Sequence, residues 1–150
     1  SDAVICLFFS LCYQTTDDLI FQSLKRFKEQ LNEEGILIFD FWNKEGVLSQ
    51  KPELKIQEYR TEDLEITKLV QPTLHTSEDC VGIDYTFYVE NEMGEISKFE
   101  EFHKVRYLSP DLLQGFLKKL NFHVELVEGW LTNQKLKSKE WSGIIVARPE

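Results

Sequence analysis

The sequence has 150 residues, with 26 acidic and 17 basic side chains and a formal net charge of −9. Its 42% apolar and 13% aromatic content excludes a disordered or fibrous chain and is typical of a single globular domain. Duplex nucleic acids and anionic membrane surfaces are both bound mainly through clustered Lys and Arg. The acidic balance therefore predicts a protein with neither nucleic acid nor membrane as a partner.

The three cysteines, Cys6, Cys12 and Cys80, form no C-x-x-C pair. An odd and small number of cysteines predicts neither a disulfide framework nor a zinc site. We therefore expect that the protein is cytoplasmic, that its thiols are reduced and that it binds no metal. The apolar stretch 3–13 has no basic residues before it and is shorter than the roughly 20 residues of a membrane span. It is better explained as a buried strand.

The first 42 residues predict a strand, a helix and a second strand. Residues 3–9 and 36–41 are almost continuously apolar, which is typical of strands buried on both faces of a parallel sheet. Between them, Thr16 is a good N-cap, and apolar residues recur at helical spacing from Ile20 to Leu31. This order predicts a βαβ unit with a right-handed crossover.

From residue 55 to 107 the apolar period changes from 3.6 to two, and Met93-Gly94 reads as a hairpin turn. This pattern predicts an antiparallel meander of three or four strands with one exposed face. Composition shows no flexible linker and therefore no hard domain boundary, so we interpret the meander as an insertion. The chain then returns to α/β, with Ser109-Pro110 opening a helix that ends near Asn121 and strands at 122–128 and 141–147. The expected division is a βαβ unit over 1–50, an antiparallel insertion over 51–108, and a helix with two strands over 109–150.

The chain lacks a glycine-rich phosphate loop, a G-x-S-x-G elbow and an H-E-x-x-H helix. In open α/β sheets, ligands bind beyond the carboxyl ends of the parallel strands. Two such ends are readable, at residues 8–13 and 40–43. Asp40 stands out there, because a carboxylate in an apolar strand is either a site residue or a hydrogen-bonded cap partner.

These residues carry a resemblance to a known family. The stretches DAVICLFFSLCYQTTDDL, LKRFKEQLNEEGILIFDFWN, EEFHKVRYLSPDLLQGFLKKLNFHVELVEGW and WSGIIVARP together resemble the second half of a class I S-adenosylmethionine-dependent methyltransferase. Glu33 and Glu34 replace the family's usual Pro and Gly before the fifth strand. The resemblance implies an α/β fold, a partial Rossmann-like sheet made of the fourth to seventh strands with an antiparallel last strand, and S-adenosylmethionine as cofactor.

The same resemblance implies that the family's glycine-rich cofactor loop would lie upstream of residue 1. We therefore expect a C-terminal portion of a methyltransferase domain that is inactive alone. Its first strand would then have an exposed edge, which favours pairing with another chain as a homodimer. The insertion over 51–108 would be either a substrate-side cap or a dimer surface.

Site residues follow from the resemblance by position. Glycine N-methyltransferases within the family carry Asn where this chain has Phe9, and an Arg that clamps a carboxylate where it has Trp42. Without that clamp, a larger and partly apolar or aromatic small molecule is the expected acceptor, and N-methyltransferases of nucleotide-linked amino sugars are a second comparison. His103 is the candidate general base. The implied cofactor-binding residues are Leu7, Phe8, Ser10 and Tyr13, and the implied substrate-binding residues are Phe9, Asp40, Trp42, Asn43 and Arg106.

Simpler interpretations stay open for several of these residues. Phe8, Phe9 and Trp42 could be packing residues, and His103 and Arg106 could form solvated pairs with Glu100 or Glu101. Two alternative functions also stay open. The chain could be a non-enzymatic module that dimerises through its strand edge, or a degenerate methyltransferase acting as a regulatory partner.

Overall fold

A computed structural model describes all 150 residues of the chain. The residues form two compact units, one made of Ser1–Lys51 with Arg106–Glu150 and the other of Pro52–Val105. The second unit is thus inserted in sequence between two parts of the first. Composition gave no sign of this division, because the segments that join the units are not rich in Gly, Ser or Pro.

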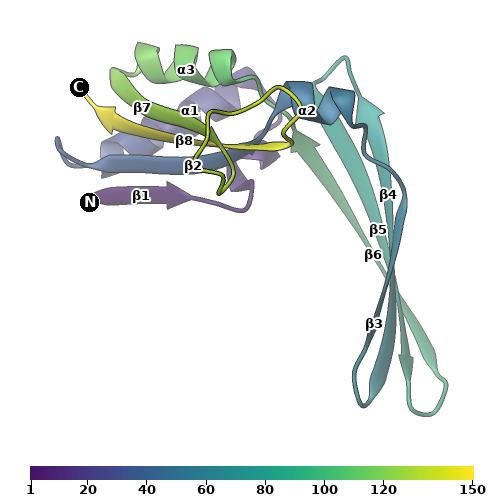
Figure 1. The fold of residues 1–150 in the computed structure, drawn as a ribbon. Coiled ribbons are helices and arrows are strands. Elements are labelled where there is room, and N and C mark those ends of the chain that lie inside the picture. Colours follow the sequence, from purple (N-terminus) through teal and green to yellow (C-terminus); the bar gives the residue numbers. More distant parts are fainter. The chain divides into compact units, whose positions relative to one another are not determined.

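The first unit is a mixed α/β sheet in the order β1-β2-β8-β7 (Figure 1). β1 and β2 run parallel, whereas β8 is antiparallel to both β2 and β7. This arrangement confirms the predicted α/β fold with an antiparallel last strand. Its elements are β1 (Ala3–Cys6), the 3-10 turn η1 (Ser10–Tyr13), α1 (Asp17–Gln30), β2 (Ile36–Trp42), α2 (Lys44–Ser49), α3 (Pro110–Lys119), β7 (Phe122–Gly129) and β8 (Ser142–Pro149).

Both long helices begin where the sequence predicts. The Thr16 hydroxyl accepts from the Leu19 amide at 3.3 Å and caps α1, and Ser109 caps α3 in the same way. The two helices lie on one face of the sheet (Figure 1). The rings of Phe21 on α1 and Phe116 on α3 pack against each other with centroids 5.7 Å apart. The core of this unit lies between the helices and that face.

The two faces of the sheet differ in burial. On β2, Leu37, Phe39 and Phe41 are fully buried, and their partners in register on β8 include Ile145. On the opposite face, Ile38 is only half-buried because no helix covers it, whereas Asp40, which contacts the turn after β1, is 1% exposed. The sheet therefore presents a partly open apolar face opposite its helices.

The first strand corrects the expectation of a doubly buried strand over 3–9. β1 ends at Cys6 because Phe8 and Phe9 adopt left-handed backbone conformations, with φ of 59° and 58°. It is also the edge strand of the sheet, and Ile5 is 60% exposed. Only β2 pairs with it, so its other edge and one face are uncovered.

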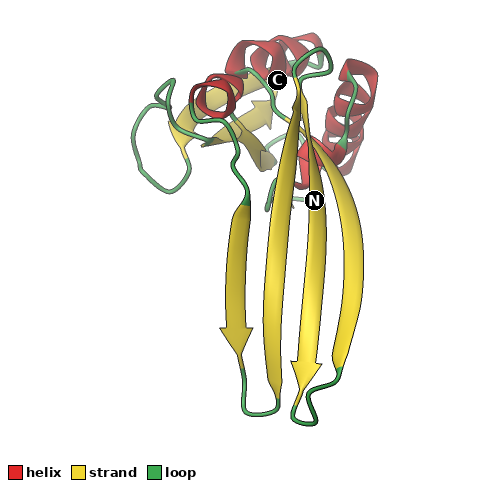
Figure 2. Cartoon of the chain, turned by 90° about the vertical axis from the view of Figure 1, so that its right-hand side faces the viewer, coloured by secondary structure: helices red, strands yellow, loops and turns green.

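The second unit is a four-stranded antiparallel sheet in the order β3-β4-β5-β6 (Figure 2). Its strands are β3 (Lys55–Arg60), β4 (Leu64–His75), β5 (Cys80–Asn91) and β6 (Ile96–Arg106), of which the last residue belongs to the first unit. The turn between β5 and β6 has Gly94 at a φ of 76°, as a hairpin glycine requires. The predicted antiparallel meander is thus confirmed, with four strands. The expectation of one exposed face is wrong for the two outer strands, since all of β3 and most of β6 are exposed on both faces. No helix of the structure combines the length and the apolar character that crossing a membrane requires.

Candidate functional site

The candidate site lies at the end of the first unit's sheet where β1, β2 and β7 finish. These three strands run in the same direction, so the segments that follow them meet at one edge of the sheet. The Asn43 amide donates to the Trp141 carbonyl at 2.7 Å, and the Trp42 amide donates to Cys12 Sγ at 3.3 Å. We call this region, formed by residues 7–13, 40–43 and 137–141, the carboxyl edge.

The segment after β1 is held in a strained turn. Phe8 and Phe9 both have positive φ, a conformation that costs a non-glycine residue roughly 1–2 kcal/mol. The Phe9 amide donates to Asp40 Oδ1 at 2.8 Å, and Ser10 Oγ donates to the Leu7 carbonyl at 2.7 Å. These bonds compensate for the strain and tie the turn to the neighbouring strand.

The predicted cofactor-side residues lie together on this turn. Phe8 is 84% exposed, Tyr13 is 48% exposed, and Ser10 is also exposed. Cys12 beneath them is fully buried, and burial raises the pKa of its thiol to about 12. Its sulfur therefore stays protonated and serves as an acceptor for the Trp42 amide, not as a nucleophile.

Asp40 is the most unusual residue of the carboxyl edge. Its side chain is 1% exposed, and while Oδ1 accepts from Phe9, Oδ2 is buried without a hydrogen-bond partner. Burial raises the pKa of this carboxyl, because desolvation of the charge outweighs the backbone N–H bonds that favour it. A buried carboxylate oxygen without a donor is costly, and such groups concentrate at functional sites.

Three aromatic side chains meet beside Asp40. The Phe9 and Trp42 ring centroids lie 6.2 Å apart, and those of Trp42 and Trp141 lie 5.2 Å apart, both edge-on. Trp141 was not among the predicted site residues. The only sequence signal was its position just before the last strand, and its contact with Trp42 spans a separation that a local pattern does not report. Its indole Nε1 donates to the Gln50 carbonyl at 3.1 Å.

Asn43 makes its contacts within the chain. It is 2% exposed, and Nδ2 donates to the Glu140 carbonyl at 2.8 Å. Weaker contacts reach the carbonyls of Lys137 and Ser138 at 3.4 and 3.3 Å. The side chain thus fixes the loop before β8, and with it Trp141, against the end of β2.

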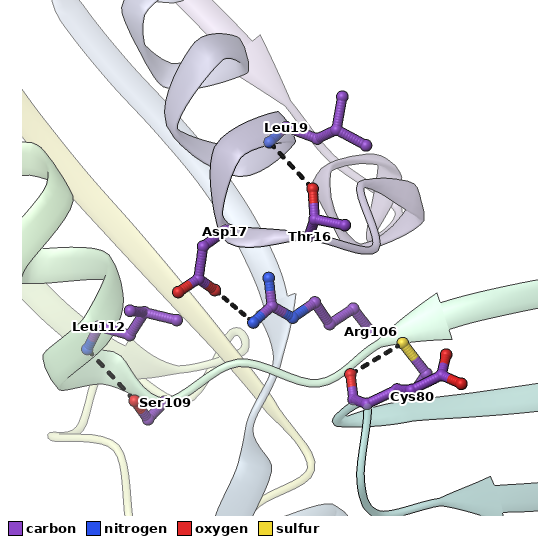
Figure 3. Close-up of polar contacts among 8 residues, drawn as sticks. Thr16, Asp17, Leu19, Cys80, Arg106, Ser109 and Leu112 are labelled. Carbon is purple, nitrogen blue, oxygen red and sulfur yellow. Dashed lines mark hydrogen bonds and ion pairs between the residues drawn. The ribbon is translucent and has the colours of Figure 1, made fainter.

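Arg106 also reaches the carboxyl edge. The segment that follows it runs beside the end of β2, where the Leu108 amide donates to the Trp42 carbonyl at 2.8 Å. Arg106 is 8% exposed, and its Nη2 pairs with Asp17 at the start of α1 (Figure 3). Its Nε and Nη1 are buried without partners. The predicted solvated pairing of Arg106 with Glu100 or Glu101 is therefore wrong, since the partner is Asp17.

His103 lies in the other unit. It is half-buried on β6, where its Nε2 is 3.4 Å from Glu101 Oε2 and its ring meets the Tyr85 ring edge-on at 5.1 Å. The contact with Glu101 is one of the pairings that the sequence suggested. The first unit therefore brings together Phe9, Asp40, Trp42 and Asn43 at the carboxyl edge. Arg106 belongs to the same unit but pairs with Asp17, and the predicted base lies in the other unit. In neither unit do three or more His, Cys, Asp or Glu side chains gather in a way that could hold a metal ion.

Comparison with known proteins gives a fold but no sequence relative. No family model matches the chain, and no curated protein is similar to it in sequence. Among solved structures, an S-adenosylmethionine-dependent methyltransferase from Clostridium acetobutylicum superposes with a TM-score of 0.79 and 20% identity, over 99% of this chain and 58% of the other.

Two further structures agree. CalS10, an amino pentose methyltransferase from Micromonospora echinaspora, gives a TM-score of 0.77 and 19% identity over 99% of this chain and 58% of its own. The sugar N-methyltransferase KedS8 from Streptoalloteichus gives a TM-score of 0.76 and 16% identity, over 99% of this chain and 56% of its own. The chain thus spans somewhat more than half the length of these proteins. Its fold is similar to the corresponding part of these S-adenosylmethionine-dependent methyltransferases.

Proposed function

We propose that this chain is part of an enzyme that transfers a methyl group from S-adenosylmethionine to a small-molecule acceptor. The observation that carries this proposal is the agreement of fold over 99% of the chain with solved methyltransferases, at TM-scores of 0.79 and 0.77. Two of the similar proteins are named as methyltransferases of an amino pentose and of a sugar nitrogen. An amine is therefore the acceptor group that we favour.

The turn after β1 is the proposed cofactor side of the site. Leu7, Phe8, Ser10 and Tyr13 offer apolar surface and hydroxyl groups at the carboxyl edge, with Phe8 84% exposed. The orphaned Oδ2 of Asp40 lies under the same turn and fits a positively charged ligand. S-adenosylmethionine supplies a methyl group activated by a sulfonium, so the chain's residues need mainly to align donor and acceptor.

The end of β2 is the proposed acceptor side. Phe9 and Trp42 provide an aromatic wall, and Asp40 and Asn43 lie beside it on the same strand end. Asp17 pairs with Nη2 of Arg106, and the Nε and Nη1 donors are buried without partners. These two donors suit a polar substituent of the methyl acceptor. His103 would act as base only for an acceptor that arrives protonated. We propose the second unit as a cap on the substrate side or as a dimer surface.

We further propose that the strands described here correspond to the family's fourth to seventh, and that a glycine-rich cofactor loop belongs to a preceding part of the domain. Two observations support this view. The chain spans 58% of the C. acetobutylicum enzyme, and β1 has an unpaired edge with Ile5 60% exposed. Pairing of further strands with that edge would complete the sheet. On this view the 150 residues alone are inactive.

The unpaired edge also favours a second candidate function. A strand edge with an exposed apolar side chain such as Ile5 is a template for pairing with another chain. The chain would then act as a dimerisation module, or as a degenerate methyltransferase that regulates a partner. Either role predicts association without catalysis.

Calorimetry separates these proposals. We expect the 150-residue chain to bind S-adenosylmethionine weakly or not at all, and a longer chain that includes the preceding residues of its gene to bind it tightly. Tight binding by the 150 residues alone would contradict the proposed division of the site. A stable dimer in sedimentation, combined with no cofactor binding by either chain, would favour the dimerisation module instead.

A further inference from the structure

Asp40 carries a buried charge that no cation in the chain neutralises. The side chain is 1% exposed, Oδ2 has no hydrogen-bond partner, and Oδ1 accepts from the Phe9 amide at 2.8 Å. Arg106, the basic side chain buried in the same unit, is paired with Asp17. A buried carboxylate that is neither paired nor fully hydrogen-bonded is rarely kept for stability alone.

An aromatic pair stands next to that carboxylate. Trp42 follows Asp40 by two positions on β2, so both side chains point to the same face of the sheet, roughly 7 Å apart along the strand. Phe9 joins them, since its amide bonds Asp40 and its ring meets the Trp42 ring at 6.2 Å. Phe9 and Trp42 are both partly exposed.

We propose that Asp40 Oδ2 and the rings of Phe9 and Trp42 form a recognition site for an organic cation. A carboxylate supplies the opposite charge, and aromatic faces attract ammonium and sulfonium groups with about 0.5–2 kcal/mol. The proposal rests on the proposed function for the source of the cation. That source is either the sulfonium of the methyl donor or the protonated amine of the acceptor.

The same chemistry disfavours other ligands. An anionic group placed against Oδ2 would meet an uncompensated like charge, and a neutral group would leave the carboxylate unneutralised. Oδ2 is covered in this structure, so entry of a ligand requires the turn at Phe8 and Phe9 to move. The two left-handed residues of that turn make it the strained element that can yield.

The test uses choline and its neutral isostere, 3,3-dimethylbutan-1-ol, as probes on the 150-residue chain. NMR follows the Phe9 amide and the indole N–H signals during titration with each probe. We expect choline to shift these signals saturably and the isostere to bind about tenfold more weakly or not at all. Equal binding of the two probes, or no effect of choline on Phe9 and Trp42, would overturn the proposal.

Two variants make the result specific. Asp40→Asn keeps an oxygen for the Phe9 amide but removes the charge. It should weaken the binding of choline about tenfold and leave the binding of the isostere unchanged. Glu33→Gln removes one charge at the exposed turn before β2, at the other end of the sheet, and should leave choline binding as it was. An Asp40→Asn protein that binds choline normally would remove the carboxylate from the site.

A final comparison distinguishes the two sources. In the longer chain, S-adenosylmethionine and the neutral S-adenosylhomocysteine are titrated into the native protein and into Asp40→Asn. If the sulfonium is the cation, the preference for S-adenosylmethionine disappears in the variant. If the acceptor amine is the cation, that preference is kept. Methyl transfer that is insensitive to Asp40→Asn would contradict this inference and leave the proposed function standing. Choline binding in a longer chain that transfers no methyl group would contradict the proposed function and leave this inference standing.

Discussion

The backbone amide of Phe9 donates to Asp40 Oδ1 at 2.8 Å, across a sequence separation of 31 residues. This bond ties the turn after β1 to the end of β2 and fixes a residue whose φ is 58°. It also occupies only one of the two carboxylate oxygens. The strained turn, the arrangement of the residues at the carboxyl edge and the unneutralised carboxylate of Asp40 are therefore all linked through this one hydrogen bond.

Two substitutions at Asp40 separate the effect of its hydrogen-bond acceptor from the effect of its charge. Asp40→Asn keeps an acceptor for Phe9, whereas Asp40→Ala leaves that amide without its partner. A part-buried donor left without a partner costs about 1–3 kcal/mol, so the Ala variant should have the lower free energy of unfolding by that amount. Urea unfolding of both variants measures the difference, and equal stability would mean that the hydrogen bond contributes nothing.

The charge of Asp40 should make stability depend on pH. Burial raises the pKa of this carboxyl above its ordinary 3.8, so the folded chain holds the proton more tightly than the unfolded chain. The contribution of Asp40 is then fully present below the unfolded pKa and is lost as pH rises through the folded pKa. The unfolding free energy of Asp40→Asn relative to the native chain should therefore increase as the pH rises from about 4 towards 7. A difference that is constant or shrinks with pH would contradict this.

The turn itself can be tested at Phe8. Because Phe8 is 84% exposed with a φ of 59°, its side chain packs little while its backbone is strained. Phe8→Gly should be more stable than Phe8→Ala by about 1 kcal/mol, since only glycine adopts this conformation freely. Thermal unfolding of the two variants compares them directly. If Ala is equally stable, the left-handed turn is not populated.

Two helical glycines should respond to alanine in opposite directions. In α2, a Cβ on Gly46 would stand 2.1 Å from the Glu140 carbonyl oxygen, so Gly46→Ala should cost about 3 kcal/mol. In α3, a Cβ on Gly115 meets nothing within 4 Å, and Gly115→Ala should stabilise the chain by about 1 kcal/mol. Denaturant unfolding of both variants checks the signs, and a harmless Gly46→Ala would mean that α2 does not pack on that loop.

These residues also show what could be predicted from the sequence. The βαβ unit, the meander and the caps at Thr16 and Ser109 follow from local patterns, and the structure confirms them. Helix α2 was not predicted, because a six-residue helix is stabilised by its contact with the backbone near Glu140 and not by its own sequence. Trp141 and the Phe9–Asp40 bond were missed for the same reason, since both depend on residues brought together only by the fold.

Trp42 provides the functional test of the acceptor side. Its ring lies between those of Phe9 and Trp141, at 6.2 and 5.2 Å, and it extends from the end of β2. In a complete and active enzyme, Trp42→Ala should raise the KM of the acceptor about tenfold, equivalent to about 1.4 kcal/mol of lost binding. The KM of S-adenosylmethionine, measured in the same assay, should change much less. An effect confined to the cofactor would instead place Trp42 on the donor side of the carboxyl edge, and the aromatic wall would then contact the sulfonium.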